Sequence, residues 1–295
     1  MKRLQIALIA ALAITTAAFA QDKAAQPTGQ QGAQAGSQQQ GAPSPKQAKT
    51  KEEYAAYNKV VTLTDPVALE QGANEFAEKY PESELRGYLF VRTAEMYQQA
   101  GNGEKLLEVG RKALEFHPNE AVVLVMMASE LAEKTKETDL DRDERLAECN
   151  KYAQQALANI DAIPAPPQMT ADQFASAKNQ LRSDAYASMG VAAYKKKDYA
   201  TAEQHFVKAL EVFPNNPDKE YTMLRLTVAL DKQAKYPEAL DWAKKTQAAA
   251  NAKPGSPVKD LADQEVARLT PLANAPAKKP AAAPTAPAPV PVTPK

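Results

Sequence analysis

The stretch "DYATAEQHFVKALEVFP", residues 198–214, decides the fold class. Within it, Ala202, Phe206 and Ala209 recur at intervals of four and three residues, which is the spacing of one face of an α-helix. Small residues in such a row let a second helix approach closely, and the phenylalanine ring fills the space between the two axes. Pro214 then ends the helix, because its ring clashes with the preceding turn and it has no N–H group to donate.

The segment immediately upstream, "SDAYASMGVAAYKKK" at 183–197, predicts the partner helix. A glycine inside a helix costs about 1 kcal/mol relative to alanine, so Gly190 indicates a close helix contact, which we expect to be with Ala202. The two segments form a helical hairpin with Asp198 in its turn. One face of the first helix carries Tyr186, Met189, Gly190 and Ala193.

This hairpin resembles the tetratricopeptide repeat (TPR) family, whose helix pairs stack into solenoids. The chain departs from the family pattern at Ala193, where the family has its second tyrosine. The resemblance implies an all-α fold, a right-handed solenoid of antiparallel helix pairs without catalytic residues or cofactors. The residues that carry it are Tyr186, Met189, Gly190, Tyr199, Ala202, Phe206, Ala209 and Pro214.

Further copies are expected, because one hairpin cannot bury its own apolar face. Residues 87–118 repeat the layout with Gly110 at the position of Phe206, and residues 220–250 repeat it without the closing proline. Less regular copies lie at 119–160 and 51–83. We therefore expect about five helix pairs over residues 50–270.

One helix is expected to be much longer than the others. Three prolines interrupt the chain at 164–167, and a helix then restarts with Thr170 as N-cap and Gln173 in the capping-box position. No helix-breaking residue follows until about Lys197, so the first turns should project beyond the neighbouring helices. A projecting helix end is either a contact surface or a tolerated insertion.

The two ends of the chain differ in composition from the helical part. Residues 1–20 combine a basic head, an apolar run and an Ala18-Phe19-Ala20 site, which predicts a signal peptide cleaved after Ala20 and export to the bacterial periplasm or beyond. Residues 21–49 are a Gln/Gly/Ala-rich linker and residues 271–295 an Ala/Pro-rich tail, both expected to be disordered. The tail is either a spacer or a docking strip. The alternative for the N-terminal run is a membrane anchor, but it is too short to span a bilayer comfortably, and no other run of 18 apolar residues exists.

Composition argues against several classes of function. The chain has 36 basic and 36 acidic residues, so loss of the basic head with the signal peptide leaves a slight acidic excess, which disfavours nucleic-acid binding. The single cysteine, Cys149, cannot form an intramolecular disulfide and is expected to be a buried thiol. His117 and His205, which we expect at a helix end and facing solvent respectively, have no sequence neighbours that suggest a metal site or a catalytic triad. We therefore expect no enzyme activity, metal or cofactor.

The acidic segment "ETDLDRDERLAE" at 137–148 partly matches the pattern of a calcium-binding loop. Asp139, Asp141 and Asp143 have the alternate spacing of such a loop, but Glu144 stands where glycine is needed and Asn150 where a bidentate glutamate is needed. These acids are better explained as capping groups for the helix that follows.

The first helices of stacked hairpins line the concave side, which TPR proteins use to hold partner segments. This implies an apolar inner surface with few charges, suited to a peptide or an amphipathic helix. The alternative is that the neighbouring coils bury these residues and no ligand binds. The alternative function is a structural protein that acts through self-association and its Ala/Pro tail. The residues expected to bind a partner are Tyr88, Val91, Val122, Val125, Ala187, Val191, Tyr194, Tyr221, Leu224 and Val228.

Overall fold

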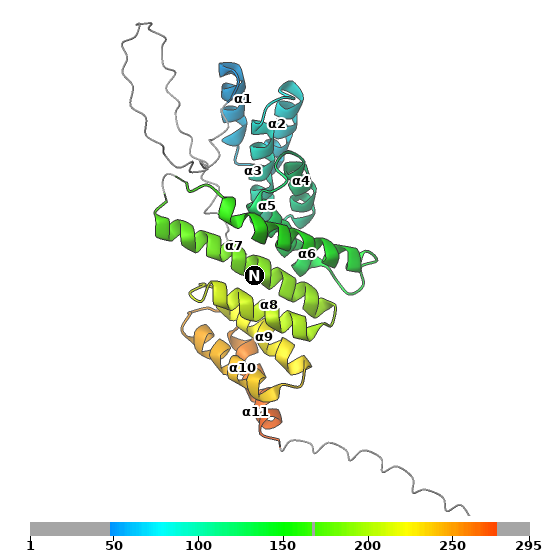
Figure 1. The fold of residues 1–295 in the computed structure, drawn as a ribbon, viewed down its shortest axis with the longest axis vertical. Helices are drawn as coiled ribbons and strands as arrows, with labels where there is room; N and C mark the ends of the chain where they lie inside the picture. Colours follow the sequence, from blue (N-terminus) through cyan, green and yellow to red (C-terminus); the bar gives the residue numbers. More distant parts are fainter. Residues whose placement is uncertain (1–47, 167–168, 276–295) are drawn as a thin grey trace, which may run out of the picture.

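The computed structural model describes residues 48–166 and 169–275, and this part of the chain is all-helical (Figure 1). The expected signal peptide, most of the Gln/Gly/Ala-rich linker and most of the Ala/Pro-rich tail lie outside the described residues. The helices are α1 (Lys51–Val61), α2 (Pro66–Lys79), α3 (Leu85–Ala100), α4 (Gly103–Phe116), α5 (Ala121–Lys134), α6 (Arg142–Asn159), a 3-10 turn (Ile160–Ala162), α7 (Ala171–Lys195), α8 (Tyr199–Val212), α9 (Lys219–Lys232), α10 (Tyr236–Asn251) and α11 (Lys259–Ala273).

Short turns with side-chain caps join the helices into antiparallel pairs. Asp65, Asn102 and Asp198 each accept a hydrogen bond from a backbone N–H in the first turn of α2, α4 and α8. Gly101 ends α3 with φ 79°, a left-handed conformation that glycine adopts without a steric penalty. The hairpins predicted from the sequence are confirmed, and their boundaries follow from these local signals.

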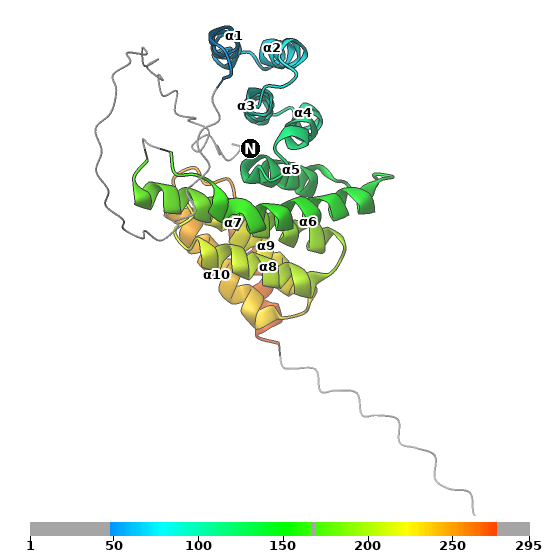
Figure 2. The same cartoon turned by 45° about the horizontal axis from the view of Figure 1, so that its top comes forward.

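The pairs stack into a solenoid with one continuous core. Each second helix packs against the first helix of the next pair, from α2 on α3 to α10 on α11. Figure 2 shows α1–α4 almost end-on while α6 and α7 run across the view, so the helix axes turn along the stack. Because every pair covers the apolar face of its neighbour, the buried residues run without a break from Tyr57 in α1 to Leu269 in α11.

The contact between α7 and α8, whose sequence suggested the fold, is tight at Gly190. A methyl carbon built on Gly190 would lie 2.5 Å from Cε1 of Phe206. Gly190 of α7 therefore packs on the Phe206 ring of α8, one turn after Ala202, whose expected contact with Gly190 stays a prediction. In α4, Gly110 has the same role, and Met127 of α5 fills the space with its Sδ atom 2.6 Å from the position of a Cβ.

α7 is the long helix predicted from the sequence, with 25 residues. Thr170 and Gln173 form the capping box: the Gln173 N–H donates to Thr170 Oγ1 at 3.3 Å, and the Thr170 N–H donates to Gln173 Oε1 at 3.0 Å. The first turns, from Ala171 to Ser176, are mostly exposed, whereas the second half of the helix is largely buried. Figure 1 shows this helix lying across the middle of the molecule, with α1–α5 on one side and α8–α11 on the other.

The sequence analysis did not foresee α11, the last helix described. Val258, Ala262 and Leu269 bury one side of it against α10, and it extends to Ala273, three residues into the range expected as tail. Its other side leaves Leu261 and Leu272 exposed, because no second helix covers it within the described residues. None of the helices in this part of the chain is both long and apolar enough to cross a membrane.

Candidate functional site

The inner side of the first helices is the candidate site, but part of it is closed. Val122, Val125 and Val191 are at most 8% exposed. They belong to the core because α5 packs directly against α7. The expectation that these three valines bind a partner is therefore wrong for this conformation of the protein.

The other expected residues are all half-buried. Tyr88 and Val91 lie on α3, at the far side of the closed valines, and the Tyr88 ring contacts His117 at 4.5 Å between ring centres. α7 and α9 meet at few points, so the residues between them are less covered than those between α5 and α7. We call this half-buried set the α7–α9 inner face; its expected members are Ala187, Tyr194, Tyr221, Leu224 and Val228.

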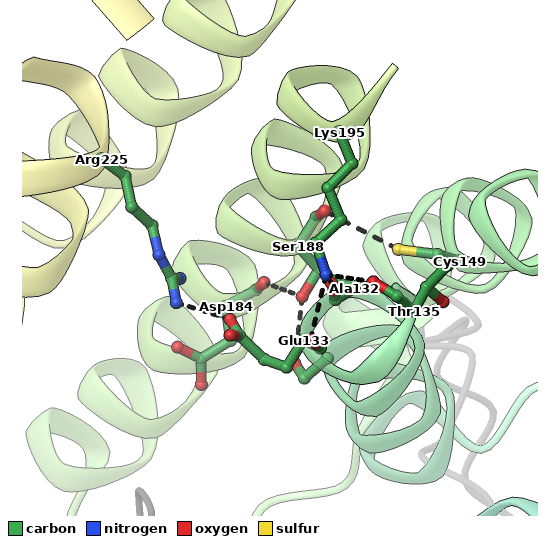
Figure 3. Close-up of polar contacts among 9 residues, drawn as sticks. Ala132, Glu133, Thr135, Cys149, Asp184, Ser188, Lys195 and Arg225 are labelled. Carbon is green, nitrogen blue, oxygen red and sulfur yellow. Dashed lines mark hydrogen bonds and ion pairs between the residues drawn. The ribbon is translucent and has the colours of Figure 1, made fainter. Parts of the chain in front are cut away.

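Three charged residues that the sequence analysis missed lie on the same side (Figure 3). Asp184 comes three residues before Ala187, and Glu133 eight residues after Val125, so both continue the helical rows of the expected residues. Arg225 of α9 crosses to α5 and donates from Nη2 to Glu133 Oε1 at 2.5 Å. The expectation that charges are sparse on this surface is wrong, because the helical rows of expected residues continue to Asp184 and Glu133.

Asp184 has an unusual environment for a carboxyl group. Its Oδ1 atom accepts a hydrogen bond from Gln180 Nε2 at 2.8 Å. Its Oδ2 atom is shielded from solvent and has no hydrogen-bond partner in the described part of the chain. Burial raises the pKa of Asp184 to about 7, and the charge of Asp218 adds to this, while Gln180 and Arg225 oppose it.

Polar contacts fix α7 against α5 beside this group. The Ser129 and Ser188 hydroxyl oxygens lie 3.0 Å apart, and Ser188 donates to the Asp184 carbonyl oxygen at 2.7 Å. The Cys149 thiol of α6 donates to the Ser188 carbonyl oxygen at 3.7 Å (Figure 3). Burial raises the pKa of Cys149 to about 12, so this thiol is an unreactive packing group, as the sequence predicted.

Lys195 at the end of α7 holds the end of α5. Its Nζ atom donates to the carbonyl oxygens of Ala132, Glu133 and Thr135 at 2.5, 3.0 and 2.7 Å (Figure 3). These carbonyls have no partner inside the helix, since they belong to its last turn and C-cap. The charged ends of α5, α7 and α9 are thereby held in fixed relative positions.

A further buried acid lies on α3. Glu95 is 6% exposed, and its carboxylate contacts Arg92 at 3.4 Å. Burial raises the pKa of Glu95 to about 7 despite this cation. Glu95 is too deeply covered to belong to the open part of the inner side.

Two shallow depressions lie away from the α7–α9 inner face. One, of about 560 Å³, separates the projecting start of α7 from the loop between α8 and α9 and includes Asp172, Asn179 and Phe213. The other, of about 280 Å³, lies along α2. Neither includes a residue expected to bind a partner, so any partner of the α7–α9 inner face would lie on an open surface.

Within the described residues, no group of three or more His, Cys, Asp or Glu side chains could hold a metal ion. His205 does not face solvent as expected: it is half-buried and stacks on Tyr186 at 6.4 Å between ring centres. Burial lowers the pKa of His205. His117 is the C-cap of α4, as the sequence predicted.

Comparison with known proteins supports the repeat. Residues 183–216, which contain the α7–α8 hairpin, match the family model of the tetratricopeptide repeat. The α7–α8 hairpin thus matches one tetratricopeptide repeat, and the described helices on either side of it form further helix pairs. No curated protein sequence matches the chain.

Two solved structures show partial similarity to this chain. PilW, described as a widely conserved type IV pilus biogenesis factor, is 17% identical with a TM-score of 0.48, and the match covers 76% of this chain and 90% of that one. The APC/C hetero-tetramer Cut9–Hcn1 is 14% identical with a TM-score of 0.30, covering 73% of this chain and 45% of that one. We assign no function from either likeness.

Proposed function

We propose that the protein is a non-catalytic scaffold that holds a segment of another protein on the α7–α9 inner face. The observation that carries the proposal is the set of half-buried Tyr, Leu and Val side chains there, on helices of a TPR solenoid. Large rings at a half-buried surface gain the most from further burial, and such residues dominate the affinity of protein interfaces.

The rigidity of this surface supports the same proposal. Lys195 joins α7 to α5, and the Arg225–Glu133 ion pair joins α9 to α5. A surface whose helices are already fixed loses little conformational entropy when a partner binds, so more of the contact energy remains for affinity.

The test is a comparison of two variants in a pull-down from cell-envelope extract. Tyr194→Ala with Tyr221→Ala should keep the helical circular dichroism spectrum and lose the partner that the wild type retains. Lys208→Ala, an exposed change on α8, should retain it. Each retained protein is then purified and titrated against both variants by calorimetry. Equal affinity for the double variant and the wild type would refute the proposed surface.

We further propose that the protein acts in the cell envelope, outside the cytoplasm. The sequence of residues 1–20 supports this, with Lys2 and Arg3 ahead of the apolar run and the Ala18-Phe19-Ala20 site at its end. The mature protein should begin at Gln21. N-terminal sequencing of the fractionated protein tests this, and recovery of Met1 on the protein in a membrane or cytoplasmic fraction would contradict it.

Self-association is the second candidate, and one observation favours it. Leu261 and Leu272 are exposed on α11, the helix at the open end of the stack. Light scattering after gel filtration distinguishes this candidate, because only self-association predicts a dimer that Leu261→Lys converts to a monomer.

A further inference from the structure

The carboxyl group of Asp184 lies on the α7–α9 inner face, in the row that continues to Ala187 and Tyr194. Its Oδ2 atom has no hydrogen-bond partner in the described chain and is shielded from water. Buried polar atoms without a partner are rare because they lose the hydrogen bonds that water would supply. A partner group that donates to this oxygen would remove that cost.

The cation nearest to this carboxyl group is already engaged. Arg225 pairs with Glu133 at 2.5 Å, and Figure 3 shows the Asp184 side chain beside this ion pair. Arg225 is thus paired with Glu133, and within the described residues no cation forms an ion pair with Asp184 itself. The negative charge of Asp218, at the start of α9, also acts on Asp184 and raises its pKa.

The surroundings suit a long basic side chain. Tyr221 and Leu224 of α9 and Ala187 of α7 are half-buried apolar residues on the same face. Lysine and arginine bury their aliphatic stems against such surfaces while the charged end meets a carboxylate. An acidic side chain would instead meet Asp184 and Glu133, which repel it.

We propose that Asp184 accepts a lysine or arginine side chain of the protein segment held on the α7–α9 inner face. The partner is accordingly a segment with a basic residue, flanked by apolar residues that contact Tyr194 and Tyr221. Oδ2 is shielded in this structure, so the proposal requires the half-buried side chain of Gln180 or Arg225 to turn away and admit the cation of the partner. This inference rests on the proposed function and adds the chemical class of the ligand.

The experiment uses four degenerate nonapeptide libraries, each with one fixed central residue: lysine, arginine, glutamine or glutamate. Immobilised full-length protein should retain the lysine and arginine libraries about tenfold more than the glutamine library, as expected for a charge-assisted hydrogen bond. Asp184→Asn should remove this preference and leave retention of the glutamine library unchanged. Glu211→Gln, which removes an exposed acid on α8, is the matched control and should keep the preference.

The outcomes separate the two proposals. The role of Asp184 would be overturned if Asp184→Asn kept the same preference for basic peptides as the wild type. A preference of the wild type for the glutamate library would overturn it as well. Failure of the wild type to retain any library, or equal retention by Tyr194→Ala with Tyr221→Ala, would refute the proposed function and this inference with it. Circular dichroism and gel filtration of each variant confirm that it is folded before the comparison.

A second measurement is the pH dependence of retention. The lysine ligand stays charged between pH 6 and 8, while the pKa of Asp184 is about 7 in the free protein. Retention of the lysine library should therefore rise about tenfold over this range in the wild type and stay flat in Asp184→Asn. Arg225, Glu133 and Asp218 are the other charged groups near this carboxyl group, and none of them is a histidine. A flat profile in the wild type would overturn the assignment.

Discussion

At the scale of single residues, the contact between Gly190 and Phe206 sets how closely α7 and α8 approach. The absence of a side chain at position 190 leaves room for the ring, which is 1% exposed. The cost of glycine inside a helix, about 1 kcal/mol relative to alanine, is offset by burial of an aromatic side chain, which contributes about 1.5–3 kcal/mol. The pairing of a glycine on α7 with a large ring on α8 therefore stabilises the hairpin as a whole.

Replacing Gly190 with leucine should overpack this seam and lower the free energy of unfolding by about 1–3 kcal/mol. Lys196→Leu, an exposed change one turn and a half further along the chain, should alter it by less than about 0.5 kcal/mol. Chemical denaturation measures both. The smaller change Gly190→Ala should also lower the free energy of unfolding, and adding Phe206→Leu to it should restore part of that loss. Strictly additive losses of free energy would show that the two residues are not in contact.

Asp184 makes the stability of the protein depend on pH. Its pKa is raised from 3.8 to about 7, so the folded state binds more protons than the unfolded state between about pH 4 and 7. Stability from this group is present below pH 4 and is lost as the pH rises through 7, with a slope of at most about 1.4 kcal/mol per pH unit.

Asp184→Asn should therefore be more stable than the wild type at pH 8 and gain nothing at pH 4. The thermal midpoints of the two proteins, measured at intervals from pH 4 to 8, give the difference directly. Glu211→Gln on the exposed side of α8 is the control and should follow the wild type. A constant difference between Asp184→Asn and the wild type would contradict the burial of this carboxyl group.

At the scale of elements, α7 organises the molecule. Its end caps α5 through Lys195, its middle packs on α8 through Gly190, and its start projects beyond the stack. Arg142 of α6 also donates a hydrogen bond to the Lys195 carbonyl oxygen. Three helices, α5, α6 and α7, are thus joined by polar contacts at the C-terminal end of α7.

Lys195→Met should destabilise the protein by about 1–3 kcal/mol, because three carbonyl oxygens at the end of α5 lose a charged donor while the aliphatic stem is kept. Lys196→Met, at the exposed neighbouring position, is the matched control. Hydrogen exchange should rise in the last turn of α5 and in the loop before α6 in the first variant alone. Unchanged exchange there would show that the contacts do not hold the loop.

At the scale of the whole molecule, the described part of the chain is a complete packing unit except at its last helix. Thr50 caps α1, and the Lys49 N–H donates to the buried Glu53 carboxylate at 2.7 Å, so the first described helix has a capped start. At the other end, α11 buries Leu269 and leaves Leu261 exposed. The stack therefore has one open end, from which the Ala/Pro-rich segment continues.

Deleting residues 21–47 and 276–295 together should leave the helical content and the thermal midpoint nearly unchanged. The reason is that the core of the described residues runs from Tyr57 to Leu269, and the composition of the deleted segments predicts disorder. Circular dichroism of the wild type and the deletion variant is the measurement. A midpoint lowered by more than a few degrees would show that one of the segments packs against the solenoid.

The sequence by itself determined the helix pairs, their turns and the repeat. Helical periodicity, the caps at Asp65, Asn102 and Asp198, and Gly101 are local signals, because each acts between residues a few positions apart. The resemblance at residues 183–216 followed from the same local spacing of small and large residues. α11 was missed because its buried positions are few and its helix contains Pro271, which obscures the pattern.

Only the tertiary structure decided which inner residues are open. Val125 and Tyr221 occupy equivalent rows of their helices, yet Val125 is fully buried while Tyr221 is half-buried. The difference arises because α5 and α7 pack directly, whereas α7 and α9 meet at few points. Likewise, Arg225 and Glu133 are 92 residues apart in the chain, and only the turn of the stack brings them together beside Asp184. Distances of this kind depend on how whole helices pack, which the spacing of residues within one helix does not encode.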